Sequence, residues 1–136
     1  MRSTTFLVLI CVLIFCAARP KKKVSPEIMD IFSSKISQYN EKCSQQAQIT
    51  QDFAIGHITN ALIPYDSNLL KYIECIYENL GFYTEKGDFK RDLIIHTFSY
   101  MNPSLTNKCI NKARVQEERL NKTFLFAACV ADELGT

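Results

Sequence analysis

Residues 66–82 read DSNLLKYIECIYENLGF, and this stretch indicates how the chain folds. Its apolar residues recur three or four positions apart, which is the spacing of one face of an α-helix. The residues on this apolar face are Leu69, Ile73, Ile76 and Leu80. The run 66–68 offers side chains that cap a helix N-terminus, and Gly81 offers the left-handed conformation at which helices often end. The stretch therefore predicts one complete helix with a buried face.

Five other segments show helical spacing and start signals. Ser25 and Asn102 each precede a proline, Thr50 precedes a short apolar run, and Asp88 is expected to cap the fourth helix. The five segments are 25–43, 50–58, 88–98, 102–113 and 120–134. No stretch alternates with a period of two for long enough to predict a strand. The sequence therefore predicts an all-α fold, a compact bundle of about six helices.

Length and composition exclude several classes of protein. The chain has 136 residues, of which 47% are hydrophobic and 22% charged, so it has room for one ordered domain. Its formal net charge of +2 is too small to indicate nucleic acid as a partner. A multidomain enzyme and a polytopic membrane protein are both excluded.

The first eighteen residues have the pattern of a secretory signal peptide. Arg2 is the only charge before the apolar run 6–18, which ends in the small residues Ala17 and Ala18. An uncleaved membrane anchor is the alternative, but thirteen apolar residues are too few to span a bilayer. We therefore expect a signal peptide over 1–18, cleavage after Ala18, and a secreted, extracellular domain over 19–136 without membrane insertion.

Cleavage would leave an even number of cysteines in an oxidising compartment. The four that remain are Cys43, Cys75, Cys109 and Cys129. They predict two disulfides, for which three connectivities are possible. A metal site is not expected, because neither His57 nor His96 lies near a cysteine in the sequence.

No sequence motif supports catalysis. The chain has no nucleophile elbow, zinc-binding helix, phosphate-binding loop or dinucleotide-binding loop. Glu117 and Glu118 are adjacent on a predicted helix, so their side chains diverge and cannot act as a facing acid–base pair. We expect no enzyme activity, no catalytic residues and no cofactor.

The order and spacing of the four cysteines resemble the insect odorant-binding proteins of the pheromone-binding and general-odorant-binding type. The segments 72–76, 80–82 and 86–89 resemble that family as well. Family members carry six cysteines, and the two that are missing here would stand at Lys71 and Leu120. The chain therefore resembles the four-cysteine branch called C-minus.

This resemblance implies a pairing, a fold and a function. It implies that Cys43 pairs with Cys75 and Cys109 with Cys129, and that the helices enclose an apolar cavity. The missing third bridge would join the third helix to the last. The implied function is that of a carrier, which moves odorants, pheromones or similar small hydrophobic molecules through aqueous fluid. The implied partners are that ligand and a membrane odorant receptor, and the implied state is a monomer or weak dimer.

The candidate ligand-binding residues are large apolar side chains on the predicted helices. They are Phe32, Ile36, Phe53, Ile58, Ile73, Ile76, Leu93, Phe98, Phe124 and Ala128. A hydroxyl such as that of Tyr77 or Tyr100 could orient a polar end of the ligand. The alternative is a secreted helical signalling or venom/salivary protein that acts through its surface and has a filled core.

Overall fold

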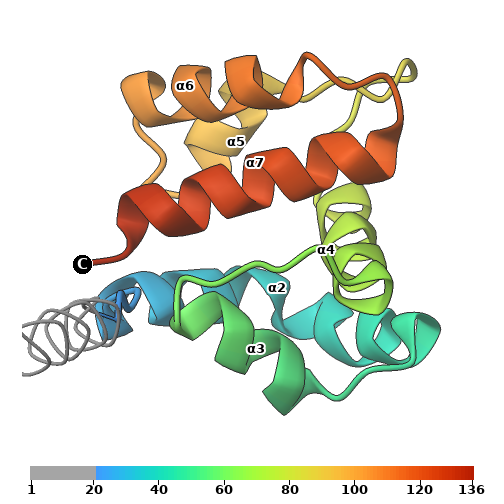
Figure 1. Ribbon diagram of the computed structural model, residues 1–136, viewed down its shortest axis with the longest axis vertical. Coiled ribbons are helices and arrows are strands. Elements are labelled where there is room, and N and C mark those ends of the chain that lie inside the picture. The colour runs from blue at the N-terminus through green and yellow to red at the C-terminus, as the bar shows by residue number, and fades with distance from the viewer. Residues whose placement is uncertain (1–20) are drawn as a thin grey trace, which may run out of the picture.

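The computed structural model describes residues 21–136, and within them the chain is all-helical (Figure 1). The helices are α2 (Pro26–Ala47), α3 (Gln51–Thr59), α4 (Ser67–Asn79), α5 (Arg91–Thr97), α6 (Pro103–Ala113) and α7 (Arg119–Leu134). The described residues contain no strand, only an isolated antiparallel bridge between Tyr83 and Phe89. The predicted all-α fold is confirmed, whereas the predicted signal peptide lies outside the described residues and stays a prediction.

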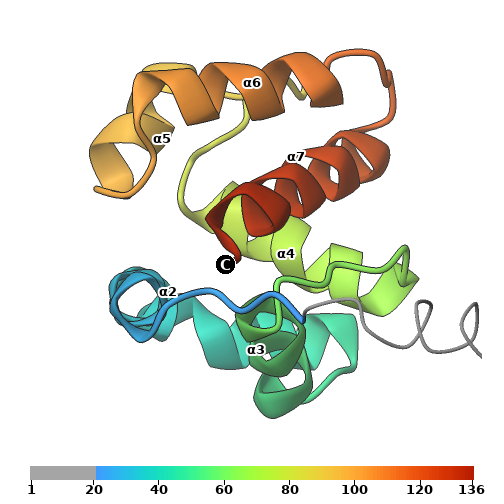
Figure 2. The ribbon, with the colours of Figure 1, turned by 60° about the vertical axis from the view of Figure 1, so that its left-hand side comes forward.

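The helices form two groups that α4 connects (Figures 1 and 2). In both views α2 and α3 lie together below α7, and α5 and α6 lie above it. The helix α4 packs against α2 and against α7, and α6 packs along α7. The hydrophobic core therefore extends from one group to the other through the buried face of α4.

Side-chain caps set the start of four helices. In each, an oxygen of the cap accepts a hydrogen bond from the backbone N–H three residues later. These caps are Ser25, Thr50, Asp66 and Asn102. After α4, Gly81 adopts a φ of +78°, so the predicted left-handed stop is confirmed.

The predicted start of the fourth helix at Asp88 is wrong. The helix α5 begins at Arg91, after Lys90. The carbonyl oxygen of Asp88 accepts a hydrogen bond from the Thr84 backbone N–H, which together with the Tyr83–Phe89 bridge holds the preceding segment in a turn. The Asp88 carboxylate is used elsewhere, because it accepts a hydrogen bond from Lys122 Nζ at 2.7 Å.

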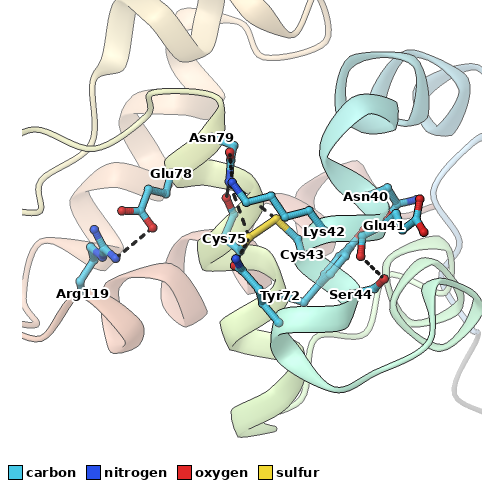
Figure 3. The surroundings of a disulfide bond; sticks show 11 residues. Asn40, Glu41, Lys42, Cys43, Ser44, Tyr72, Cys75, Glu78, Asn79 and Arg119 are labelled. Atoms are coloured by element: carbon cyan, nitrogen blue, oxygen red, sulfur yellow. Dashed lines mark hydrogen bonds and ion pairs between the residues drawn. A yellow bond between two sulfur atoms is a disulfide. The ribbon is translucent and has the colours of Figure 1, made fainter.

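Two disulfides cross-link the helices in the pairing that the family resemblance implied. Cys43 of α2 bonds Cys75 of α4, and Cys109 of α6 bonds Cys129 of α7, each across a Cα–Cα distance of 5.5 Å. Asn79 lies beside the first bond and donates from its amide to the Cys75 carbonyl oxygen (Figure 3). Each disulfide thus fixes one helix pair, α2 with α4 and α6 with α7.

Removing either disulfide should destabilise the protein by a similar amount. The sequence separations of 32 and 20 residues correspond to about 3.7 and about 3.3 kcal/mol of loop-closure entropy in the unfolded chain. We expect each of the double variants C43A/C75A and C109A/C129A to lose about 3–4 kcal/mol of unfolding free energy in urea titrations. An unchanged midpoint for either pair would contradict the cross-linking role of that bond.

Candidate functional site

A cavity of about 60 Å³ lies between the two helix groups. That volume is several times the roughly 10–15 Å³ that one water molecule needs. Its wall is formed by side chains of α2, α3, α4, α5 and α7, and by the segments that connect them. Among the described residues, the wall carries no Asp, Glu, Lys, Arg or His side chain. The cavity therefore suits an apolar, uncharged guest.

Half of the candidate ligand-binding residues lie on this wall. They are Phe32, Ile58, Ile73, Ile76 and Phe98. Phe98 packs against the ring of Phe32 at a centroid distance of 5.9 Å and against that of Phe82 at 5.7 Å. Residues from α2 and from the segment after α4 thus meet the segment that follows α5, as the helical spacing alone could not show.

The other five candidates lie away from the wall. Ile36 is fully buried in the core, whereas Phe53 is 44% exposed and its ring packs edge-on against His57. Phe124 is covered by the ring of Tyr65, 5.1 Å away. Leu93 and Ala128 are half-buried against the core. Their role in ligand binding stays a prediction.

Several wall residues were not among the sequence-based candidates, because they lie outside regular helical spacing or next to a residue that was chosen as a candidate. Val24, Ile63 and Met101 come from connecting segments, which have no periodicity to follow. Ile94 rather than its neighbour Leu93 faces the cavity. On α7 the sequence does carry a pattern that could have identified wall residues, because apolar residues at helical spacing line the wall there. They are Ala127, Val130, Ala131 and Leu134.

Aromatic rings form a continuous layer along one side of the cavity. Tyr77 contacts Phe82 at 5.6 Å and Phe126 at 5.8 Å between ring centroids. Phe126 in turn stacks on Phe89 at 4.4 Å. Such contacts restrict ring rotation and fix the shape of the wall.

Three tyrosines give the wall its phenol groups. Tyr72 donates its hydroxyl proton to Asn40 Oδ1 at 2.6 Å, and burial raises its pKa to about 12. Burial also raises the pKa of Tyr77 and of Tyr100 well above the usual value for a phenol. All three phenols are therefore neutral at physiological pH.

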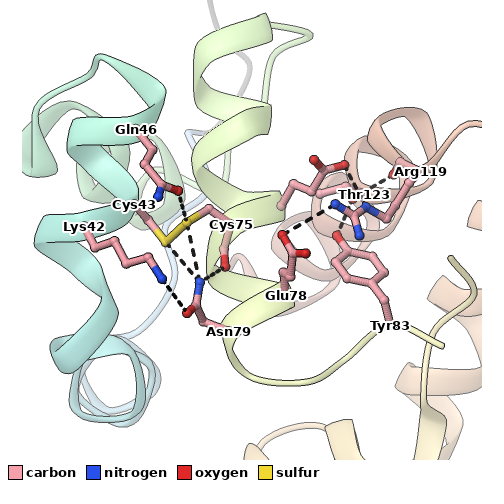
Figure 4. A network of polar contacts seen from close by, with 10 residues as sticks. Lys42, Cys43, Gln46, Cys75, Glu78, Asn79, Tyr83, Arg119 and Thr123 are labelled. Carbon is pink, nitrogen blue, oxygen red and sulfur yellow. Dashed lines mark hydrogen bonds and ion pairs between the residues drawn. A yellow bond between two sulfur atoms is a disulfide. The ribbon is translucent and has the colours of Figure 1, made fainter. Parts of the chain in front are cut away.

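An ion-pair cluster joins α4 to the start of α7 (Figure 4). The Arg119 guanidinium lies 3.2 Å from a Glu74 oxygen and 3.5 Å from a Glu78 oxygen, and 4.8 Å from the centre of the Tyr83 ring. The hydrogen bond to Glu74 raises the pKa of Arg119. The Tyr83 hydroxyl shares a hydrogen bond with Thr123, so the segment after α4 is also tied to α7.

Between residues 21 and 136, no three His, Cys, Asp or Glu side chains converge as a metal site would require. Within the same range, no helix is both long and apolar enough to cross a bilayer.

A mostly apolar cavity of this kind is typical of sites that bind small hydrophobic molecules. Residues 25–133 match the PBP/GOBP family, the pheromone-binding and general-odorant-binding proteins, and the chain belongs to this family. Proteins of this family are binding and carrier proteins for small hydrophobic ligands. No curated protein and no solved structure shows a significant match to the chain.

The ion-pair cluster lies near the place where the resemblance puts a third disulfide. Lys71 is on α4, one helical turn before Glu74, and Leu120 follows Arg119 on α7. The two helices that this implied disulfide would join are connected here by ion pairs. Partly exposed ion pairs contribute about 0–1 kcal/mol, less than the 2–4 kcal/mol of a typical disulfide. The contact between α4 and α7 is consequently the less constrained side of the cavity.

A second ion pair supports the aromatic layer. Lys122 of α7 is buried, with 9% of its side chain exposed, and its ammonium contacts the Asp88 carboxylate at 2.7 Å. Asp88 adjoins Phe89, whose ring stacks on the cavity residue Phe126. The hydrogen bond and charge of Lys122 hold the pKa of Asp88 below its usual value.

Replacing Asp88 by Asn should destabilise the protein in a pH-dependent way. The Lys122 ammonium would lose its anionic partner, and because the Asp88 side chain is 58% exposed we expect about 0.5–1 kcal/mol less unfolding free energy at pH 7. The Asp88 pKa is lower in the folded state than in the unfolded chain, so the ion pair stabilises the fold fully at pH values above the unfolded-state pKa. This stabilisation is lost as the pH falls through the folded-state pKa of Asp88.

Urea titrations at pH 7 and pH 2.5 measure this effect. The difference between the wild type and D88N should shrink at the lower pH. Asp92→Asn is the matched control, because Asp92 is exposed and pairs with the half-exposed Arg91, so that change should cost less than about 0.5 kcal/mol. Equal losses in the two variants would contradict a special role for Lys122 and Asp88.

Proposed function

We propose that this protein is a carrier that binds odorants, pheromones or similar small hydrophobic molecules in the central cavity and transports them through aqueous fluid. The observation that carries the proposal is the apolar cavity between α2, α4 and α7, whose described wall has no charged side chain. Membership of the PBP/GOBP family supports the same function. Transport requires only reversible binding, so the protein needs no catalytic group.

The proposal includes secretion. Family members are typically secreted, soluble proteins. The predicted signal peptide over 1–18 and the two disulfides agree with an oxidising, extracellular destination. We further assign the chain to the four-cysteine branch of the insect odorant-binding proteins, because Lys71 and Leu120 stand where that family has its other two cysteines.

The proposed binding surface is the cavity wall, with Phe32, Ile73, Ile76 and Phe98 as its main apolar contacts. A cavity of about 60 Å³ is smaller than the roughly 300–1,000 Å³ of most ligand pockets. We therefore expect compact ligands, and we expect larger ones to enter only with movement of wall side chains. A membrane odorant receptor is the proposed downstream partner of a monomer or weak dimer.

Filling the cavity from α7 should weaken ligand binding. Ala127 lies on the wall, so Ala127→Leu would place about three extra carbon atoms there and weaken binding at least about tenfold. Ala128 is not on the wall, and Ala128→Leu is the matched control with the same chemical change on the next residue. Binding is measured with N-phenyl-1-naphthylamine, whose emission increases in apolar surroundings, and a small apolar competitor.

The wild type should bind the fluorophore at micromolar concentration and release it to the competitor. The chain has no Trp, so indole emission from the protein does not overlap with the emission of the fluorophore. If the wild type binds neither the fluorophore nor the competitor, the carrier proposal is wrong. A secreted signalling or venom/salivary protein that acts through its surface would then be the better explanation.

A further inference from the structure

A second pocket, of about 330 Å³, lies where α6, the start of α7 and the segment before α5 meet (Figure 1). It is lined by Asp88 and Phe89 of that segment, Ile110 of α6, Arg114 directly after α6, and Lys122 of α7. None of these five residues lines the central cavity. Most ligand pockets have roughly 300–1,000 Å³, so the second pocket is large enough for a small organic molecule.

Part of the lining of this pocket is apolar and held in place. Ile110 is buried, with 9% of the residue exposed. The half-buried ring of Phe89 stacks on Phe126 at a centroid distance of 4.4 Å and lies 5.3 Å from the ring of Tyr83. Since neighbouring rings restrain Phe89, its free face offers a fixed apolar surface to the body of a ligand.

The rest of the lining carries two cations and one anion. The Asp88 carboxylate accepts a hydrogen bond from Lys122 Nζ at 2.7 Å. An ammonium has three hydrogens to donate, so this bond leaves two of those of Lys122 for other acceptors. The Arg114 side chain is exposed and forms no ion pair with any residue between 21 and 136. The lining therefore has one positive charge more than it has negative charges.

The charge of Arg114 acts within this pocket. The hydrogen bond and the charge of Lys122 are the main causes that lower the pKa of Asp88, and the charges of Arg114 and Lys86 lower it further. One carboxylate thus lies within electrostatic range of three cations. A ligand anion would balance the excess positive charge, whereas a ligand cation would increase it.

We propose that the second pocket binds a compact organic anion, whose apolar body lies against Phe89 and Ile110 and whose carboxylate binds Arg114 and Lys122. A guanidinium binds a carboxylate through two parallel hydrogen bonds, and the Arg114 guanidinium has no carboxylate partner among the described residues. The two pockets share no lining residue. The inference therefore goes beyond the proposed carrier function and does not depend on it.

Three small molecules separate the two parts of this recognition. Phenylacetate has both a carboxylate and an apolar ring. The compound 2-phenylacetamide has the same number of heavy atoms without the charge, and acetate has the charge without the ring. Each is titrated calorimetrically into the wild type at pH 7. Phenylacetate should bind at least about tenfold more tightly than either of the others, because only phenylacetate uses both the cations and the apolar lining.

Two charge variants test the role of Arg114. Arg114→Gln should weaken phenylacetate binding about tenfold, the lower end of the range for a hydrogen bond to a charged group, because the guanidinium is exposed. Lys112→Gln is the matched control: Lys112 is exposed on α6 two residues earlier and does not line the pocket. That variant removes the same charge and should change the affinity less than about twofold. Circular dichroism shows that each variant is folded.

A third variant and nuclear magnetic resonance locate the ligand. Ala127→Leu fills the central cavity, so it should leave the phenylacetate affinity unchanged. In nitrogen-15-labelled wild type, phenylacetate should shift the backbone amide signals of Phe89 and Arg114 and leave those of Ile73 and Phe98, on the central wall, in place.

The outcomes separate this inference from the carrier proposal. Equal losses in R114Q and K112Q would show a general effect of charge and overturn the second site. Loss of phenylacetate binding in A127L, or shifts confined to the central wall, would place the ligand in the central cavity, so the inference is wrong while the carrier function stands. If the wild type does not bind phenylacetate, the inference is wrong, and the titration with N-phenyl-1-naphthylamine still decides the carrier function.

Discussion

The fixing of α4 between α2 and α7 is the constraint on which the rest of the structure depends. Cys43–Cys75 bonds α4 to α2, and the Arg119 cluster with Glu74 and Glu78 joins it to α7. Nearly half of the residues of α4 are buried, because the helix has neighbours on both sides. A helix so placed determines how far apart the two helix groups stand, and therefore whether space remains between them.

The two attachments of α4 differ in strength, and this difference bears on binding. A disulfide restrains α2 and α4 covalently. The partly exposed ion pairs between α4 and α7 contribute only about 0–1 kcal/mol. At this contact between α4 and α7, Tyr77 packs against Phe126. This wall contact between α4 and α7 therefore depends on packing and ion pairs, without a disulfide between the two helices.

The wall combines shape from aromatic rings with very little polarity. Dispersion contacts with rings such as Phe32 and Phe98 favour any compact apolar guest, so they supply affinity with little discrimination. Selectivity then depends on the few groups that are not apolar. On the wall these are the phenols of Tyr72, Tyr77 and Tyr100, and the Tyr72 hydroxyl already donates to Asn40.

The sequence by itself determined the six helices, the side-chain caps of four of them and the number of disulfides, because helical periodicity and capping are local properties. It also carried the family resemblance, and with it the cysteine pairing. Only the tertiary structure decided which buried residues face empty space. Ile36 and Ile73 share the same helical signal, yet one lies within filled core and the other on the cavity wall. Asp88 likewise carries a capping signature, but its carboxylate is taken by Lys122, 34 residues away. Periodicity shows which face of a helix is buried, whereas contact with a void or a distant charge depends on how the helices are placed in space.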